Sequence, residues 1–467
     1  MATVNIQRLI QEINTKLLTV TDPLEILRLS KAVDQLKIGK VFTVWSFSSL
    51  PNAQDNVGKL FLVESENTLY FAYPYFQDPE KISWVSIINV KLNTTMLSWG
   101  NGSAFRLGVG YRGSPTIASQ DSPMVMAGGN STGVAWCDVS IGNAHGLALK
   151  TDGTLWTWGT QSQGGLGDGT TTARNSPGTV AGGGTTWCAI QAMAYASLAI
   201  KIDGTLWSWG CNASGQLGDG TTVSRCSPGT TWGSYTTWCK AGGMRNTAIA
   251  LKKDGTVWTW GPAASGQLGD GTTTIRCSPG SIWGSYTSWC EISSGSSTLA
   301  AIKTDGTLWT WGSNISASLA NGSFSGNRCS PGTVIGGGNN WCGVCMGFDV
   351  YGGIKSDGTI WMWGCGSPGQ KGDGNLSGTV SPGTVIGGGN NWCKLSVWFR
   401  NSMAIKTDGT LWGWGCNRYG QLGIGDNSTA KSSPTKVYSG ECNENEYKWF
   451  TVAAGPFTAV GIRNNTQ

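Results

Sequence analysis

The sequence predicts an all-β fold: a seven-bladed β-propeller closed by pairing of its N- and C-terminal strands. A short α-helical anchor and a small β adaptor precede the propeller. Three observations predict this fold: a repeat of about 51 residues, a Trp-Gly signature that occurs seven times, and a first repeat that is split between the two ends of the chain. We therefore divide the 467-residue chain into 1–40 (helical oligomerisation segment), 41–90 (β adaptor) and 91–467 (propeller).

The repeat is clearest at residues 150–159, Lys-Thr-Asp-Gly-Thr-Leu-Trp-Thr-Trp-Gly, and it returns almost unchanged. Within a unit, an apolar strand leads through Asp-Gly to a Trp-x-Trp-Gly strand, then to a Gly-rich loop, a Ser-Pro-Gly turn and a further strand. Asp-Gly between two strands predicts a type I′ hairpin turn. Four strands per unit are typical of a propeller blade. The equivalent lysines, 51 or 52 residues apart, are Lys150, Lys201, Lys252, Lys303, Lys355 and Lys406.

The first unit is incomplete, which predicts how the ring closes. Residues 90–99 supply only the later strand of its hairpin, without the lysine or the Asp-Gly turn, whereas residues 455–463 match the missing earlier strand. The two ends would complete one blade and leave no exposed sheet edge. The seven Trp-Gly tryptophans are Trp99, Trp158, Trp209, Trp260, Trp311, Trp363 and Trp414.

The Asp-Gly turn, the Trp-x-Trp-Gly strand, the Gly-Gln-Leu-Gly segment and the Ser-Pro turn together resemble the regulator of chromosome condensation repeat family. This resemblance spans about 370 residues and implies a seven-bladed propeller of roughly 50-residue units. The chain departs from the family at one position. Units of the family usually carry a histidine before the hairpin, and only His145 keeps it here. The equivalent residues elsewhere are Thr247, Thr298, Asn401 and Thr458.

Composition excludes several function classes. Charged residues make up 13% of the chain, the formal net charge of +5 is dispersed, and no run of Lys or Arg suggests a nucleic-acid groove. The first 20 residues lack the apolar core of a signal peptide, and no apolar run approaches the roughly 18 residues of a membrane span. We expect a soluble protein made in a cytoplasm, without nucleic-acid partners or membrane insertion.

The segment 1–40 is predicted to form two amphipathic helices. The first carries an apolar seam with alternating spacings of four and three residues, at Ile6, Ile10, Ile13, Leu17 and Val20. The second begins at Asp22 as N-cap and stops at Gly39. Forty residues cannot bury such seams alone. We therefore expect a homo-oligomer, with a trimer favoured.

The segment 41–90 is predicted to form short strands at 41–47, 59–64 and 68–73, broken by Pro51, Pro74 and Pro79. The succession of Leu50-Pro51, a glycine, a Leu-Tyr-Phe strand and Trp84 resembles a module of tailed-phage fibre and appendage proteins. The resemblance implies a virion protein, with other virion proteins as partners of residues 1–90.

The fourteen cysteines lie mostly on the repeat, six of them in Trp-Cys pairs. Three interpretations are open: small buried apolar residues, disulfide bridges within a unit such as Cys226 with Cys239, and zinc ligands. Zinc is the weakest, because Cys342 and Cys345 form a single Cys-x-x-Cys pair without a second.

No catalytic residue, cofactor or metal ion is predicted. His145 is the only histidine and is expected to be structural. No nucleophile elbow and no phosphate loop occur. The Gly-Asp-Gly segments supply one aspartate per unit, too few for a calcium site. These expected loop residues are Asp168, Asp219, Asp270 and Asp373.

The tryptophans divide into two groups. Those of the Trp-x-Trp pairs recur in every unit and are expected in the blade core. Loop aromatics of the form Trp-Gly-Ser-Tyr occur in only two units, at Trp232, Tyr235, Trp283 and Tyr286. These four residues are the candidate site: they could stack on a sugar ring or wedge between adjacent blades.

The sequence favours a structural virion protein of a tailed bacteriophage, a tail fibre or similar appendage. Its propeller would bind a host surface glycan or protein without bond-breaking chemistry. One alternative is a capsid decoration or head-fibre protein. Another is a regulatory propeller such as a small-GTPase exchange factor, which the repeat resemblance implies, although no insertion or basic tail accompanies it. A polysaccharide depolymerase ranks last.

Overall fold

The computed structural model describes residues 94–465 apart from 104–105, 111–118, 131–133, 161–162, 234, 285, 388, 428 and 439–446, together with four strands between 41 and 89. The helices predicted within 1–40 lie outside the described residues. The described chain is all β apart from one short 3-10 turn, η4 (Ile315–Ala317).

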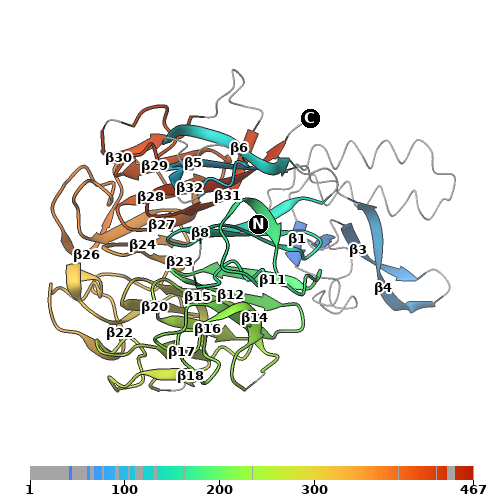
Figure 1. Ribbon diagram of the computed structural model, residues 1–467, viewed down its shortest axis with the longest axis horizontal. Helices are drawn as coiled ribbons and strands as arrows, with labels where there is room; N and C mark the ends of the chain where they lie inside the picture. The colour runs from blue at the N-terminus through green and yellow to red at the C-terminus, as the bar shows by residue number, and fades with distance from the viewer. Residues whose placement is uncertain are drawn as a thin grey trace. The chain divides into compact units, whose positions relative to one another are not determined.

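Seven four-stranded antiparallel sheets follow one another around an axis to form the propeller (Figure 1). The strands nearest the axis are β7 (Trp136–Ile141), β11 (Trp187–Ala192), β15 (Trp238–Gly243), β19 (Trp289–Ser294), β23 (Trp341–Met346), β27 (Trp392–Val397) and β31 (Tyr447–Ala454). The second strands are β8 (His145–Lys150), β12 (Ala196–Lys201), β16 (Ala248–Lys252), β20 (Thr298–Lys303), β24 (Val350–Lys355), β28 (Asn401–Lys406) and β32 (Thr458–Asn465).

The third strands are β9 (Leu155–Gly159), β13 (Leu206–Gly210), β17 (Val257–Gly261), β21 (Leu308–Gly312), β25 (Ile360–Gly364), β29 (Leu411–Gly415) and β5 (Thr94–Gly100). The outer strands are β10 (Arg174–Thr179), β14 (Arg225–Thr230), β18 (Arg276–Ser281), β22 (Arg328–Thr333), β26 (Thr379–Thr384), β30 (Lys431–Lys436) and β6 (Gln120–Asn130). We number the blades 1 to 7 from β7–β10 to β31-β32-β5-β6.

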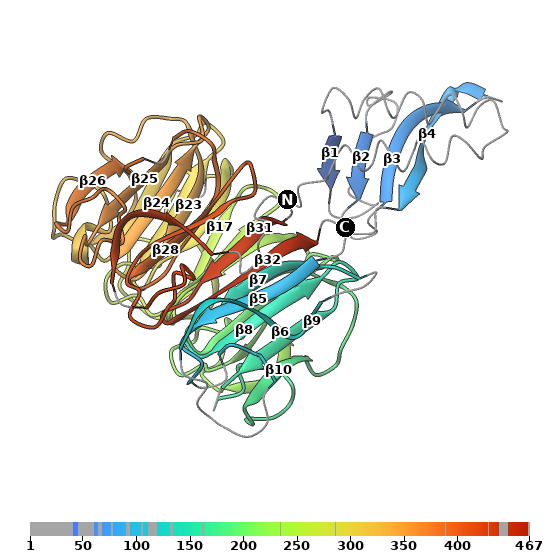
Figure 2. The same ribbon diagram turned by 90° about the horizontal axis from the view of Figure 1, so that it is seen from above.

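The predicted closure of the ring is confirmed in blade 7. β32 pairs antiparallel with β5, in register from Thr458 opposite Gly100 to Asn464 opposite Thr94. Figures 1 and 2 show these strands, from opposite ends of the colour scale, side by side. The blade therefore holds the two ends of the propeller together through strand hydrogen bonds, and its sheet has no edge left at the seam.

A separate four-stranded sheet lies in the adaptor segment, with β1 (Val41–Val44) parallel to β2 (Leu60–Val63). β3 (Thr68–Tyr75) and β4 (Asp78–Asn89) continue it antiparallel. The three predicted strands are present, but the prediction that Pro74 and Pro79 break them is wrong. β3 runs through Pro74, next to a register irregularity, where a missing N–H is tolerated.

Two local predictions about the blade need correction. The Asp-Gly turn is not type I′, because Gly204 has a φ of 80° and Asp203 is not among the described residues with positive φ. Gly204 N–H instead donates to Lys201 O, a type I turn followed by a left-handed glycine. The Ser-Pro-Gly segment is not a turn either: it lies within the outer strand, whose register shifts opposite 208–210. Proline is tolerated at such an edge.

The second tryptophan of each Trp-x-Trp pair forms the blade core, as predicted. Trp209 and Trp260 are fully buried, and their Nε1 atoms donate to Gly165 O and Gln216 O, each in the loop of the preceding blade. The indole thus ties neighbouring blades together. The first tryptophan of the pair is only half-buried and packs against the edge of the core, as Trp156 and Trp258 do, so the prediction holds for it only in part.

Candidate functional site

Successive strands of a blade are antiparallel, so its loops lie at two ends. Loops from first to second strand and from third to outer strand lie at one end, which we call the loop end. The hairpin turns from second to third strand and the links to the next blade lie at the other, the turn end. The two ends carry different side chains and are described in turn.

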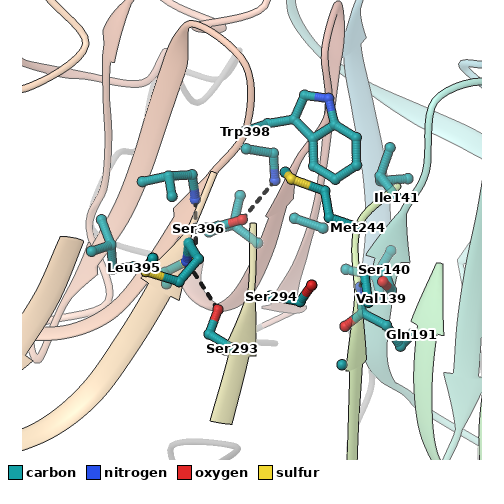
Figure 3. A pocket seen from close by; sticks show the side chains of 18 of the residues that line it. Val139, Ser140, Ile141, Gln191, Met244, Ser293, Ser294, Leu395, Ser396 and Trp398 are labelled. Carbon is teal, nitrogen blue, oxygen red and sulfur yellow. Dashed lines mark hydrogen bonds between the residues drawn. The ribbon is translucent and has the colours of Figure 1, made fainter. Parts of the chain in front are cut away.

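The inner strands enclose an axial channel of about 220 Å³ (Figure 3). Ser293 Oγ accepts the Met346 N–H and Ser396 Oγ accepts the Ala454 N–H, both at 2.9 Å, so side chains of one blade bind the backbone of the next. Three further hydrogen bonds continue this belt: Ser140 Oγ accepts the Ala192 N–H, Gln191 Nε2 donates to Gly243 O, and Cys345 Sγ accepts the Val397 N–H. Two of the seven junctions lack such a side chain, at Gly242 and Ala453.

The channel wall offers little acid–base chemistry. Among its described residues, Cys345 is the one titratable side chain, and burial raises the pKa of its thiol to about 11. Ser140, Ser293 and Ser396 already accept backbone N–H groups, and the Ser294 hydroxyl donates to Gly295 O. The described wall of the channel is therefore a belt of hydrogen bonds that joins neighbouring blades.

The mouth of the channel at the loop end carries an arginine–aromatic rim. Phe348 and Phe399 make an edge-to-face pair with centroids 4.8 Å apart. Arg400 lies 4.9 Å from the Phe399 ring, and Arg245 lies 5.4 Å from the Phe348 ring. Both arginines are exposed. Trp398 lines the channel just inside (Figure 3).

The rim continues onto blades 6 and 7. Phe457 makes an edge-to-face contact with Tyr419 at 5.6 Å, and Arg106 lies 5.4 Å from its ring. Arg106 donates to Asn143 O, and burial lowers the pKa of its guanidinium. Arg418 stacks on Tyr419 at 5.8 Å. Each aromatic ring thus carries a cation on it, a favourable arrangement for both partners.

Among the described residues, the carboxylate of Asp349 lies next to this rim. Burial raises the pKa of Asp349, and the nearby Arg400 opposes that shift. Four arginines of the rim (Arg106, Arg245, Arg400 and Arg418) outnumber it. The rim is therefore positively charged.

His145 forms a pair that the sequence did not predict. Its Nε2 lies 2.9 Å from Ser197 Oγ, the separation of a base and a nucleophile. Both residues are buried, Ser197 Oγ also donates to Gly165 O, and burial lowers the pKa of His145 to about 4. The hydrogen bond between these two buried side chains joins blades 1 and 2. The expectation of a structural histidine fits this geometry.

At the turn end, the repeated lysines pack on tryptophan. Lys201 Nζ lies 3.9 Å from the Trp207 ring and 4.8 Å from the Trp187 ring. The Trp207 indole donates to Thr205 Oγ1, which donates in turn to Asp203. The repeat thus builds a lysine–tryptophan cage in blades 2 to 6, around Lys201, Lys252, Lys303, Lys355 and Lys406.

The predicted candidate aromatics lie at the turn end, but they are not equivalent. Trp232 and Trp283 are each 64% exposed, so neither is wedged between blades. Tyr235 instead covers the cage of its own blade, 3.7 Å from Lys252 Nζ. Tyr286 does the same for Lys303. Whether the two tryptophans bind a ligand stays a prediction.

The aspartates of the Gly-Asp-Gly segments bind their own loops. Asp219 accepts from Thr221 and pairs with Arg225 at 2.9 Å. Asp168 and Asp270 make the same pairs with Arg174 and Arg276. Across the described part of the chain, no cluster of three His, Cys, Asp or Glu side chains could hold a metal ion.

Four of the described cysteines differ from the expectation of buried apolar residues because they are exposed, whereas Cys211 is buried. The Cys239 and Cys290 side chains are exposed, and their thiols donate to Leu251 O and Ile302 O at the bulge beside them. Among the thirteen described cysteines none is bridged, and Cys226 and Cys239 remain separate. The hydrogen bond from the thiol to the backbone carbonyl at the bulge explains why cysteine stands at this position better than packing in the core does.

The rim was missed by the sequence reasoning. Its residues follow each inner strand at a fixed offset, the segment where the repeat units differ most: Met244-Arg245, Gly347-Phe348 and Trp398-Phe399-Arg400. Variation at one offset within a regular repeat was the available signal. The exposed Arg245 reaches Phe348 of blade 5 past blade 4, whose residues there are Gly295-Ser296-Ser297.

Comparison with known proteins agrees with the fold. The regulator of chromosome condensation (RCC1) repeat matches residues 203–233, 254–302 and 408–461, and a second model of that repeat matches 136–164. The seven-bladed β-propeller of this chain thus contains RCC1 repeats. In the described residues, no helix is long and apolar enough to cross a membrane.

Among curated proteins, the ultraviolet-B receptor UVR8 of Arabidopsis thaliana is 27% identical over 308 residues, 64% of this chain and 69% of UVR8. The human E3 ubiquitin-protein ligase HERC2 is 26% identical over 51% of this chain, which spans only 5% of HERC2. Among solved structures, Prp20p of Saccharomyces cerevisiae superimposes with a TM-score of 0.70 at 16% identity, covering 80% of this chain and 92% of Prp20p. Human WBSCR16 superimposes with a TM-score of 0.69 at 19% identity, covering 80% of this chain and 100% of WBSCR16. These two likenesses concern the fold alone.

Proposed function

We propose that this protein is a non-catalytic binding propeller that docks an acidic macromolecular partner on the arginine–aromatic rim. The observation that carries the proposal is the exposed pair Arg245 and Arg400 beside the edge-to-face rings of Phe348 and Phe399. Aromatic and arginine side chains dominate the energetic centres of protein interfaces. A positive rim selects a partner of opposite charge and speeds its association.

The absence of catalysis is part of this proposal. It is supported by the burial of the His145–Ser197 pair and by the lack of acid–base groups on the described channel wall. A propeller can bind a partner through its loops without an accessible nucleophile–base pair and without acid–base groups in its channel.

Of the functions considered from the sequence, a protein-binding regulatory propeller gains most support, because UVR8 and the HERC ligases are RCC1-repeat relatives. The tail-fibre, head-fibre and host-attachment hypotheses stay predictions. So do the oligomer of residues 1–40 and the virion location. The virion hypotheses rest on the segment 50–84 and the oligomer on the apolar seams of 1–40, and the relatives named above lend them no support.

The test compares wild type with the double variant Arg245→Ala/Arg400→Ala against purified small GTPases and against arrays of bacterial surface glycans. The matched control is Lys253→Ala, an exposed cation at the turn end. We expect any partner of the wild type to lose at least tenfold in affinity with the double variant and to keep full affinity for the control. Unchanged binding by the double variant contradicts the proposal.

A further inference from the structure

The lysine–tryptophan cage of blade 2 lacks the tyrosine ring that covers the cages of blades 3 and 4. Among the described residues, the cages of blades 5 and 6 also have only their two indoles. In blade 3 the ring of Tyr235 lies 3.7 Å from Lys252 Nζ, three residues before the inner strand. Blade 2 has Gly184 at the equivalent position. Over the described part of the chain, Lys201 has ring contacts with Trp187 and Trp207 alone. In blade 2 the place of the tyrosine ring is therefore open.

The frame of the cage is otherwise the same in the two blades. The Trp187 and Trp207 rings lie 5.9 Å apart at 81°, and the rings of Trp238 and Trp258 lie 6.0 Å apart at 85°. Lys201 Nζ is 3.9 Å from its nearer indole, and Lys252 Nζ is 3.8 Å from its own. Blade 2 thus keeps the cation and both indoles that hold a tyrosine ring in blade 3.

The loops that link blade 1 to blade 2 and blade 2 to blade 3 also have similar backbone conformations, and the first leaves room for an aromatic ring. Gly182 and Gly233 have equivalent positions and φ values of 74° and 89°. A Cβ placed on Gly184 would meet only Thr186 Oγ1 at 3.9 Å and the Gly182 carbonyl at 4.0 Å. Gly184 is exposed and is not in the positive-φ region. The loop therefore neither fills the site nor blocks it.

A second feature of blade 2 points to the chemistry of the occupant. Ile202 follows Lys201 in the hairpin turn and is 52% exposed. The equivalent residues of blades 3 and 4 are the polar Lys253 and Thr304. An exposed aliphatic side chain next to an open cage suits a polypeptide, which brings apolar neighbours with its ring, better than a hydrated sugar.

We propose that Trp187, Lys201 and Trp207 bind an aromatic side chain, tyrosine first, from a partner polypeptide. Ile202, which follows in the turn, contacts the apolar residues that flank this side chain. The ring would stack on the lysine ammonium as Tyr235 does within this chain. The site lies at the turn end and goes beyond the binding proposed for the rim.

The experiment uses p-cresol, the side-chain analogue of tyrosine, as probe. The indole N–H of Trp207, which donates to Thr205 Oγ1, serves as a site-specific NMR signal, assigned through Trp207→Phe. We expect a saturable shift of this signal with p-cresol at millimolar concentration. Gly184→Tyr should abolish the response, because the introduced ring would occupy the site from within. Gly183→Tyr, one residue away with nothing within 4 Å of its Cβ, should respond like wild type.

Three outcomes overturn the proposal: no shift with p-cresol, an equal response in Gly184→Tyr, or a shift with methyl glucoside but not with p-cresol. The last would identify a sugar site instead.

Ile202→Thr provides an independent experiment. It should weaken binding of tyrosine-containing peptides flanked by apolar residues at least threefold, while leaving p-cresol binding unchanged. A failure of the proposed binding at the rim would not change these p-cresol and peptide measurements, because the rim variants and the cage variants lie at opposite ends of the propeller.

Discussion

The two ends of the propeller use the repeat in opposite ways. At the turn end, blades 2 to 6 repeat one construction, in which lysine packs on indole, indole donates to threonine and threonine donates to aspartate. At the loop end, the segment after each inner strand differs from blade to blade, with Arg245, Phe348 and Arg400 in places where blade 4 has glycine and serine. Regular residues stabilise the blades, and variable ones are available for recognition. The turn end varies in one respect: a tyrosine covers the cage in blades 3 and 4 but not in blades 2, 5 and 6.

The largest effect should come from the repeated core. Trp260→Ala removes a fully buried indole and its hydrogen bond to Gln216 O. We expect a loss of about 3–5 kcal/mol in the free energy of unfolding, because the site cannot collapse around so large a cavity. Urea unfolding followed by circular dichroism measures it. A loss below about 1 kcal/mol would show that the repeated tryptophans do not carry the stability of the blades.

The next largest effect is expected at His145, a residue of the loop end, whose contribution to the free energy of unfolding depends on pH. Burial lowers the pKa of His145 to about 4, whereas in the unfolded chain it is about 6.5. Between these values the unfolded state binds more protons, so stability should fall by roughly 3 kcal/mol from pH 7 to pH 4 on account of this residue.

The control for this pH effect is His145→Thr, since threonine stands at several equivalent positions. Unfolding of both proteins at pH 7, 5 and 4 isolates the histidine, because other titrating groups cancel in the difference. Parallel pH profiles would contradict the burial of a neutral imidazole.

A smaller effect is expected at the hairpin turn. Asp254 Oδ1 accepts the N–H and the hydroxyl of Thr256, and these hydrogen bonds lower the pKa of Asp254. Asp254→Ala should destabilise the protein by about 1 kcal/mol at pH 7. The difference should vanish as the pH falls below about 4, because a carboxyl with a lowered native pKa stabilises only when ionised. A difference independent of pH would assign the effect to the backbone of the turn.

The smallest effect on stability is expected at the rim. Arg245→Ala/Arg400→Ala should change the free energy of unfolding by no more than about 0.5 kcal/mol, because both side chains are exposed. Thermal unfolding by calorimetry checks this value. A large loss would place the arginines among the structural residues and remove the contrast between the two ends.

Much of the architecture could be predicted because it depends on local periodicity. The period of 51 residues, the Trp-Gly strand and the split first unit lead to seven blades and to the pairing of β32 with β5. The turn type was predicted wrongly, since Asp-Gly is compatible with both a type I′ turn and a type I turn with a left-handed glycine. The Ser-Pro segment was misassigned because proline also suits an outer strand.

The candidate site was less predictable. Trp232 and Tyr235 look alike as loop aromatics in the sequence, yet one is exposed and the other lies on Lys252. The rim joins residues of blades 3, 5, 6 and 7, and their proximity is a property of the closed ring. No local pattern encodes a contact between Arg245 and Phe348, 103 positions apart.

The sequence by itself determined the repeat, the blade and the closure, because hydrophobic period and turn residues act over short distances along the chain. Tertiary structure decided which side chains meet around the axis: the belt from Ser396 to Ala454, the buried pair of His145 and Ser197, and the charged rim. It also decided that the cage around Lys201 stays open while that of Lys252 is covered. The physical reason is that these contacts depend on how neighbouring blades pack and how the link loops fold back, and both are settled only when the ring is complete.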